Sequence, residues 1–337
     1  MNANIHALLS KLLGAEKTLE IETLMQVSSK FRIWEEGMVS RSELAQALNM
    51  ALFAGVLDRV PSGKAYTMDV AASGGKVMLD HGALRTVRWF GLGELPPGEA
   101  AITRILKPLG FRLNGVFPLD RLKMTGRSYK QIDDPENISQ FFVSELHPER
   151  FSKEFQEAVT RVLGESRDPL TPAAVSMLNE LERDGNLPLA QAQELLPVLV
   201  SCFERQHPTP TVADYEILLK ESAEMAWIAT EGNVFNHATD RVPDVYALTA
   251  EQQKLGRPMK PAVEVSSTGR IKQTAFKADP VVRQFVDADG AMIEREVPGS
   301  FYEFITRDSY VEAGVAKLDL GFDAGNATGI FKMTANG

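Results

Sequence analysis

Two of the five histidines in the chain lie where an imidazole could bind a metal ion or move a proton. His81 stands in a stretch that alternates like a β-strand, and its neighbours on the same face are apolar, so its ring should point into a partly buried space. His237 stands in the polar run NVFNHATDRVPD, directly after a long amphipathic helical pattern. Taken alone, His81 also fits a core histidine that is hydrogen-bonded to a backbone carbonyl.

Two charged residues share such apolar surroundings. Glu303 stands in SFYEFIT, where both faces of the strand carry aromatic or aliphatic neighbours. An ionised carboxylate there is costly without a cation or a close set of donors, although a salt bridge to an arginine would satisfy it equally well. Arg85 falls on the same face as His81, roughly 13 Å further along a strand that rises about 3.3 Å per residue. A buried guanidinium at that position needs an anion.

Combined, these residues predict an iron centre. Two histidines and one glutamate from different strands match the two-histidine, one-carboxylate face that holds non-haem Fe(II) and leaves positions open for substrate and O2. No H-x-D motif stands at His81, so the usual signature of the double-stranded β-helix oxygenases is absent. The ligands would be spread along the chain, with His81 before a helical block and with His237 and Glu303 after it.

The segments that must position these residues show either the period of a helix or the alternation of a strand. Ser40 and Glu43 have the spacing of a capping box and predict a helix over residues 40–57. Residues 75–90 alternate and are rich in Val, Leu, Trp and Phe, which predicts a strand. From about 149 to 230 the period is helical, with Pro and Gly between the segments, and strand patterns stand on both sides of this block.

These patterns predict an α+β fold in a single catalytic domain over residues 1–337. Its β-rich parts would span about 60–148 and 231–337, and a helical insertion would span about 149–230. No repeat with a fixed period of 20 to 50 residues is present, but the two β-rich parts could be a diverged duplication.

Composition narrows the function classes. The formal net charge of −9 argues against a nucleic-acid or anionic-membrane surface, since either would need clustered Lys and Arg. No apolar run approaches the length of a membrane span, and the N-terminus lacks the features of a signal peptide, which predicts a soluble cytoplasmic protein. Cys202 is the single cysteine, which excludes a metal site built from several cysteines, so a metal would be held by His and carboxylate. Cys202 itself is expected in the core. His147 and His207 precede prolines at segment boundaries, which favours surface or turn positions.

Six motifs occur in an order that resembles one family. They are DHGALRT (80–86), FPLDRLKMTGRSY (117–129), FFVSELHPERF (141–151), NVFNHATDRVPD (233–244), RIKQTAFKAD (270–279) and SFYEFITRD (300–308). Together they are similar to the 2-oxoadipate dioxygenase/decarboxylase family, also called 2-hydroxyglutarate synthase. The resemblance implies a vicinal-oxygen-chelate-like fold, with a curved β-sheet core and a helical insertion, and an Fe(II) enzyme distantly similar to hydroxymandelate synthase.

Carried over motif by motif, the resemblance makes His81, His237 and Glu303 iron ligands and lets Arg85 hold a substrate carboxylate. The implied reaction is the oxidative decarboxylation of 2-oxoadipate, a 2-oxo dicarboxylic acid, with O2 to 2-hydroxyglutarate and CO2, a step of lysine catabolism. A planar guanidinium suits Arg85 to a distal carboxylate because it makes two charge-assisted hydrogen bonds. Lys277 or Arg270 could do the same. We expect no nucleic-acid or membrane partner.

Two rival interpretations stay open at this point. The metal could act as a Lewis acid in a lyase, isomerase or hydrolase on the same fold, because fold does not fix chemistry. Alternatively, the chain could be a non-catalytic protein that binds a dicarboxylate through Arg85. An intact set of three ligands weighs against the second alternative, since binding alone does not need them.

Overall fold

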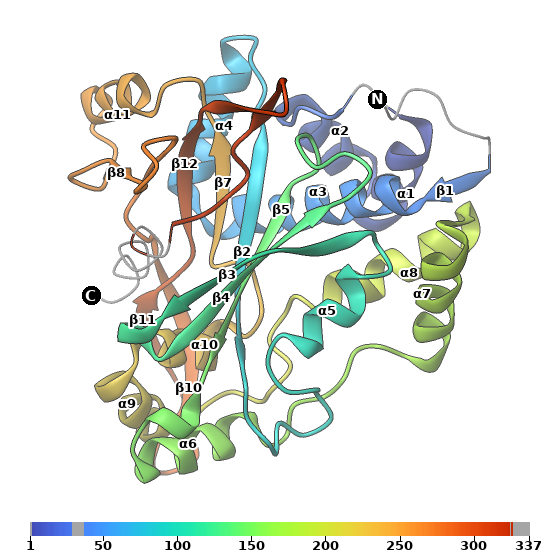
Figure 1. Ribbon diagram of the computed structural model, residues 1–337. Coiled ribbons are helices and arrows are strands. Elements are labelled where there is room, and N and C mark those ends of the chain that lie inside the picture. Colours follow the sequence, from blue (N-terminus) through green and yellow to red (C-terminus); the bar gives the residue numbers. More distant parts are fainter. Residues whose placement is uncertain (1, 29–36, 324, 326–337) are drawn as a thin grey trace.

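The computed structural model describes residues 2–28, 37–323 and 325. At its centre is a curved sheet of eight strands in the order β3-β4-β5-β2-β7-β12-β9-β8 (Figure 1). The strands are β2 (Leu79–Val87), β3 (Phe111–Leu119), β4 (Met124–Gln131), β5 (Gln140–Leu146), β7 (His237–Arg241), β8 (Glu264–Val265), β9 (Ile271–Ala275) and β12 (Phe301–Arg307). The expected β-sheet core is thereby confirmed, and β2 and β7 meet antiparallel at its middle.

The sheet consists of two halves with the same topology. The first half runs β2, α5 (Ala100–Leu106), β3, β4, β5, and the second runs β7, α11 (Val245–Lys254), β8, β9, β12. In both halves the first strand pairs in parallel with the last, and the order in the sheet is first, fourth, third, second. The hairpin of β10 (Pro280–Val286) and β11 (Met292–Pro298) is inserted before the last strand of the second half. The repeated βαβββ topology supports a diverged duplication.

Helices cover the sheet and form with it the two main hydrophobic cores of the described residues. The N-terminal helices are α1 (Ala3–Leu13), α2 (Ala15–Leu24), α3 (Arg41–Arg59) and α4 (Pro61–Ala72). The Ser40 side chain and Glu43 form the expected capping box of α3. This helix and α4 contact β7 and β12, where Tyr302 and Phe304 point into the larger core. The apolar face of the sheet thus fixes these helices in place.

The helical insertion is confirmed and divides between the two cores. Its helices are α6 (Lys153–Leu163), α7 (Pro172–Asp184), α8 (Leu189–Ser201), α9 (Val212–Glu221) and α10 (Ala223–Glu231). In Figure 1, α7 and α8 lie beside α1 and α3, whereas α6, α9 and α10 lie together at the other end of the molecule. The second group packs on Val87, Leu146 and Phe285 in the smaller core.

Several sequence expectations differ from the structure. The β-rich part expected from about residue 60 begins only at Leu79, because residues 61–72 form α4 with Pro61 in its first turn. The insertion also contains a short strand, β6 (Asn186–Pro188), which pairs with β1 (Met38–Ser40). Three residues are too few to show a period, so pairing alone reveals β6. Among the described residues, the remaining elements are the 3₁₀ turns η2 (Asp120–Leu122) and η3 (Pro148–Arg150) and the hairpin of β13 (Ser309–Glu312) and β14 (Val315–Leu318).

Burial also corrects two histidine assignments. His147 and His207 were expected at turns or on the surface; both lie outside the helices and strands, at segment boundaries, but their side chains are buried. The Nε2 of His207 lies 2.9 Å from the carbonyl oxygen of Ala229, so the polar ring is satisfied inside the core. Cys202 is buried, as expected.

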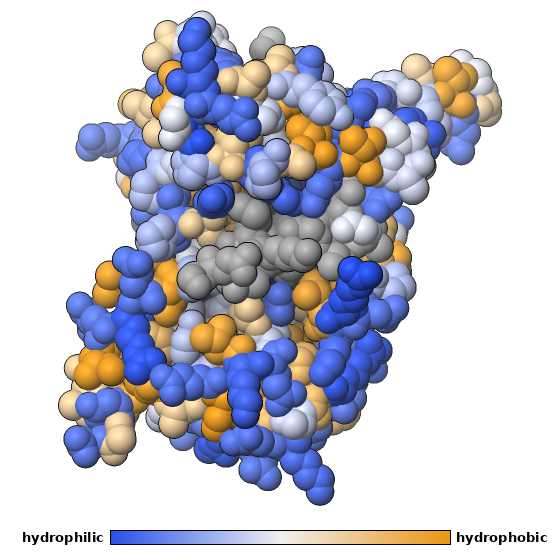
Figure 2. Space-filling view, turned by 90° about the vertical axis from the view of Figure 1, so that its left-hand side faces the viewer, coloured by the Kyte–Doolittle hydropathy of each residue, from blue (hydrophilic) through white to orange (hydrophobic). Residues whose placement is uncertain are grey.

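The outer surface is mainly polar where it can be seen. Hydrophilic side chains dominate the face drawn in Figure 2, and hydrophobic side chains occur there in separate groups. None of the helices in the described part of the chain has both the length and the apolar character that a bilayer span requires.

Candidate metal centre

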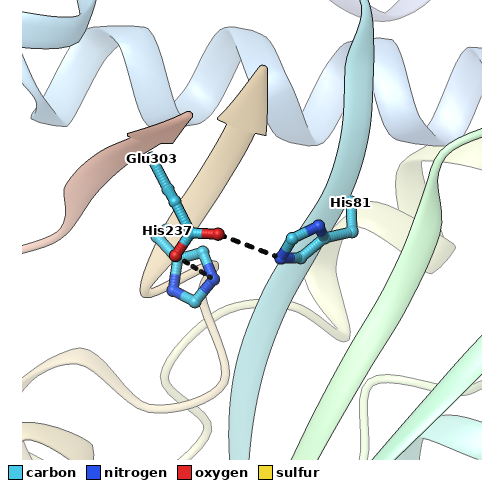
Figure 3. A group of neighbouring side chains, drawn as sticks. All are labelled: His81, His237 and Glu303. Carbon is cyan, nitrogen blue, oxygen red and sulfur yellow. Dashed lines mark ion pairs between the residues drawn. The ribbon is translucent and has the colours of Figure 1, made fainter. Parts of the chain in front are cut away.

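Three neighbouring strands each contribute one side chain to a buried cluster. His81 comes from β2, His237 from β7 and Glu303 from β12, and the three side chains point toward one another (Figure 3). The Nε2 of His81 lies 3.6 Å from Glu303 Oε1, and the Nε2 of His237 lies 3.8 Å from Glu303 Oε2. One ligand atom from each residue lies within 4.8 Å of the others, a spacing that can hold a single metal ion.

The strand register explains why residues so far apart in sequence meet here. On the middle strand, Thr239 pairs with His81 on one side and with Glu303 on the other. The Thr239 hydroxyl donates to Glu303 Oε1 at 3.2 Å and lies 3.1 Å from His81 Nε2. His237 stands two residues earlier on the same strand and therefore on the same face. No sequence pattern marks Thr239, because its role depends on cross-strand pairing.

Behind His81 lies a buried network of charged groups. Asp80 Oδ1 is 2.9 Å from His81 Nδ1, and Arg307 and Arg241 both donate to the Asp80 carboxylate. Burial alone would raise the pKa of Asp80, but the two guanidinium charges outweigh it and hold this pKa well below its usual range. Burial lowers the pKa of His81, which favours the neutral ring. An ionised Asp80 that accepts the Nδ1 proton leaves Nε2 free to bind a metal.

His237 has a neutral neighbour at its Nδ1 in place of a carboxylate. The Asn236 Nδ2 lies 3.0 Å from His237 Nδ1, and the ring of Phe301 stacks on the imidazole with centroids 4.8 Å apart. Burial, together with the nearby charge of Arg85, lowers the pKa of His237 well below its usual value. Both histidines are therefore neutral near pH 7, which is the form that binds metals.

Glu303 provides the test of whether these residues fit a metal. Burial raises the pKa of Glu303 to about 8. Its Oε2 accepts no hydrogen bond from any described residue. A cation between this carboxylate and the two imidazoles would satisfy Oε2 and favour the ionised form. The donor set of two imidazoles and one carboxylate suits Fe(II) and other first-row divalent metals.

A pocket opens above the three side chains. Its other lining residues come from both halves of the sheet and from the segment after β14; they are Ala83, Phe142, Ser144, Asn236, Gln273, Phe322 and Asp323. Gln273 lies inside the RIKQTAFKAD motif, so the sequence held a signal for it. No pattern pointed to Phe322 or Asp323, because they follow the last strand and belong to no periodic element.

Arg85, expected to hold a substrate carboxylate, is not among the residues that line this pocket. Its side chain is fully buried, and its guanidinium carbon lies 4.8 Å from the centroid of the Trp227 ring, which α10 supplies. Burial lowers the pKa of Arg85 to about 10, and the nearby negative charge of Glu224 opposes this shift in part. Arg85 pairs with Ser144 on β5, and Ser144 does line the pocket, so Arg85 stands next to its wall.

Comparison with solved structures gives relatives over nearly the whole chain. A glyoxalase-superfamily protein from Ralstonia eutropha JMP134 is 63% identical, with a TM-score of 0.93, and the match covers 96% of this chain and 100% of that chain. Hydroxyglutarate synthase from Oryza sativa, in complex with 2-oxoadipate, is 20% identical with a TM-score of 0.68 and coverages of 90% and 95%. Hydroxyglutarate synthase from Pseudomonas putida, also in complex with 2-oxoadipate, is 21% identical with a TM-score of 0.59 and coverages of 83% and 67%.

The two synthases show the shared fold, and the Ralstonia protein is a much closer relative within the glyoxalase superfamily. No curated protein matches the chain. The 2-oxoadipate dioxygenase/decarboxylase family matches residues 54–319, which span both halves of the sheet and the helical insertion. This match confirms the resemblance seen in the sequence motifs. The chain belongs to the 2-oxoadipate dioxygenase/decarboxylase family.

Proposed function

We propose that this protein is an Fe(II)-dependent dioxygenase that converts 2-oxoadipate and O2 to 2-hydroxyglutarate and CO2, with residues 1–337 acting as one catalytic domain. The observation that carries the proposal is the buried cluster of His81, His237 and Glu303 at the base of a pocket. Family membership supports the reaction class. The equation balances with one O2 consumed for each CO2 released. The corresponding role in the cell is a cytoplasmic step of lysine catabolism.

The ligands and their supports would hold the metal as follows. His81 and His237 would bind through Nε2, the ring nitrogens that face Glu303, and Asp80 would support His81 by accepting its Nδ1 proton. Glu303 binds as a carboxylate, and the Thr239 hydroxyl orients it. When bound, Fe(II) supplies the site where a 2-oxo acid is chelated and O2 is activated. Three protein ligands leave positions open for both.

The pocket walls divide into two chemical kinds. Phe142 and Phe322 present apolar rings, which exclude water from the reacting end of the substrate. Ser144 and Gln273 offer polar groups for the substrate's oxygens. We assign the distal carboxylate to Arg85, since this residue carries a buried positive charge beside Ser144 and can form a bidentate pair.

The main test is anaerobic reconstitution with Fe(II), followed by measurement of O2 uptake and CO2 release over a series of 2-oxo acids. We expect equal amounts of O2 and CO2 from 2-oxoadipate without added 2-oxoglutarate. Turnover of 2-oxoadipate without O2 uptake would instead indicate Lewis-acid chemistry, and tight binding without turnover would indicate a binding protein.

The role of Arg85 has a separate test. Arg85→Ala should lower kcat/KM for 2-oxoadipate roughly thirty- to a thousand-fold, the loss expected when one partner of a buried charged pair is removed. Arg85→Lys should recover part of this loss, because a point charge cannot reproduce the bidentate fork. The matched substrate is a 2-oxo acid of equal length without the distal carboxylate. An equal loss on both substrates would show that Arg85 does not bind that carboxylate.

A further inference from the structure

The segment Asp319–Asp323, here called the strap, lies across the pocket after β14. Its backbone is held by side chains from the first half of the sheet, since Asn114 Nδ2 and Gln140 Nε2 donate to the carbonyl oxygen of Leu320 at 3.0 and 3.2 Å. At its far end, Asp323 accepts hydrogen bonds from the backbone and hydroxyl of Ser267 in the second half. The strap therefore bridges the two halves above the candidate metal centre.

Phe322 brings the strap into contact with a candidate metal ligand. Its ring packs edge-on against His81, with centroids 4.8 Å apart, and against Phe142 at 5.1 Å. His81 is therefore held between the Phe322 ring and the carboxylate of Asp80 at its Nδ1. A change in the position of either neighbour would change the environment of the imidazole.

Arg307 contacts both of these neighbours. Its Nε and Nη2 donate to the Asp80 carboxylate at 2.9 and 2.8 Å, and its Nη1 donates to the carbonyl oxygens of Asp319 and Gly321 at 2.8 and 2.6 Å. Its guanidinium carbon also lies 5.0 Å from the centroid of the Phe322 ring. The side chains of Arg307 and Asp80 are both fully buried. One rigid, planar group thus fixes the strap and the partner of His81 in a single geometry.

Two other arginines make only half of these contacts. Arg241 donates to Asp80 Oδ2 at 2.7 Å through Nε, and its Nη1 donates to the carbonyl oxygen of Glu136, outside the strap, at 2.8 Å. Arg270 donates to Asp319 Oδ2 at 2.7 Å, and its side chain is partly exposed. These residues provide matched controls, one for the Asp80 contact and one for the strap contact.

We propose that Arg307 is a positioning residue that couples docking of the strap to occupation of the metal centre through Asp80 and His81. The inference rests on the proposed function, because it takes His81 to be a metal ligand. A metal on Nε2 fixes the His81 ring and its Asp80 partner, and Asp80 in turn fixes the Arg307 fork that holds Asp319 and Gly321. By linkage, metal binding stabilises the docked strap, and the docked strap favours metal binding to the same extent.

The experiment is hydrogen exchange, measured by mass spectrometry on peptides that contain residues 319–323, with and without saturating Mn²⁺ as a redox-stable probe. In the unaltered protein we expect Mn²⁺ to slow this exchange at least about fivefold, the lower end of usual coupling between sites. Arg307→Lys keeps the charge but loses the fork, and the slowing should fall below about twofold. Melting curves check that this variant is folded.

The controls separate coupling from general loosening. Arg270→Ala should speed exchange of the strap without metal, while Mn²⁺ still slows it by the factor seen in the unaltered protein. Arg241→Lys should keep the same response to Mn²⁺. Equal slowing in Arg307→Lys and in the unaltered protein would overturn the proposal, as would Mn²⁺ that binds but leaves strap exchange unchanged.

A metal-free comparison distinguishes this proposal from the proposed function. If the unaltered protein binds no metal, the proposed centre is wrong, but the link from Asp80 to the strap can still be measured. Asp80→Asn should then speed strap exchange at least about fivefold, whereas Arg241→Lys should not. Unchanged exchange in Asp80→Asn would contradict the link, and this isosteric variant also serves if Arg307→Lys does not fold.

Discussion

The two βαβββ halves carry equivalent histidines on their first strands but differ in what surrounds them. In the first half, Asp80 precedes His81 and lies 2.9 Å from its Nδ1; in the second, Asn236 precedes His237 and lies 3.0 Å from its Nδ1. Two residues after each histidine stand Ala83 and Thr239. The histidine pair thus keeps the symmetry of the halves, and the neighbouring positions do not.

The last strands of the two halves show the main difference. In the second half, β12 places Glu303 opposite Thr239, whereas in the first half β5 places Phe142 opposite Ala83. One half therefore adds a carboxylate to its histidine, and the other adds an apolar ring that lines the pocket. A symmetric site would have four protein ligands. The loss of symmetry leaves an apolar side chain of the pocket wall, Phe142, at the place of a fourth ligand, and the proposed function would use this side for substrate and O2.

The largest effect should come from single substitutions at the two equivalent positions, Glu303 and Phe142. Glu303→Gln should lower O2-dependent turnover roughly a thousandfold and remove most of the bound metal, because a buried carboxylate ligand is lost. Phe142→Leu at the equivalent place should keep full metal content. Metal analysis and oxygen uptake measure both variants. A Glu303→Gln variant with normal metal content would show that Glu303 is not a metal ligand.

The opposite face of the first strands differs as well. Leu84 packs in the larger core, while its counterpart Asp240 accepts hydrogen bonds from Tyr66 and from the backbone of Met78. Burial raises the pKa of Asp240 to about 6. Because Asp240 can bind a proton and Leu84 cannot, this position makes the stability of the protein depend on pH only through the second half.

Folded Asp240 binds a proton more tightly than the unfolded chain does, so its contribution to stability is greatest below about pH 4 and falls as the pH rises to about 6. With an unfolded pKa near 3.9, the loss is on the order of 3 kcal/mol. Asp240→Asn should remove this pH dependence. Urea unfolding of the metal-free protein at pH 4, 5 and 6 measures the difference, and parallel pH curves for the two proteins would exclude the assignment.

The residues before the two histidines should differ in their effect on metal affinity. Asp80→Asn should raise the Kd for Mn²⁺ roughly ten- to a hundredfold, because the charge that orients His81 is lost. Asn236→Ala should raise it less than tenfold, since the neutral amide contributes a weaker hydrogen bond to His237. Equilibrium dialysis gives both constants. Equal increases in the Kd would mean that Asp80 and Asn236 support their histidines equally.

The smallest effect should come from the hydroxyl between the ligands. Thr239→Val removes the donor to Glu303 and should destabilise the metal-free protein by about 1 kcal/mol, the net value of one hydrogen bond. Thr239→Ser keeps the donor and should lose less. Chemical denaturation compares the two variants, and a Val variant as stable as the Ser variant would show that this hydroxyl does not matter.

Local patterns in the sequence determined the type of most elements and indicated the residues of the candidate metal centre. The capping box at Ser40 is a signal over four residues, and alternation marked the strands that carry His81 and Glu303. Polar side chains among apolar strand neighbours are costly to bury, so the combination of His81, His237 and Glu303 indicated a site that no one of them indicated alone. The order of motifs then indicated the family.

Tertiary structure alone decided how those residues are combined. Thr239 acquires its role from register with β2 and β12, Phe142 from its place opposite Ala83, and Phe322 from a strap that crosses the pocket. Arg307 lies 227 positions from Asp80, so no sequence period could relate them. Pairing and packing between distant segments depend on the global fold, whereas burial and capping preferences are written into neighbouring residues.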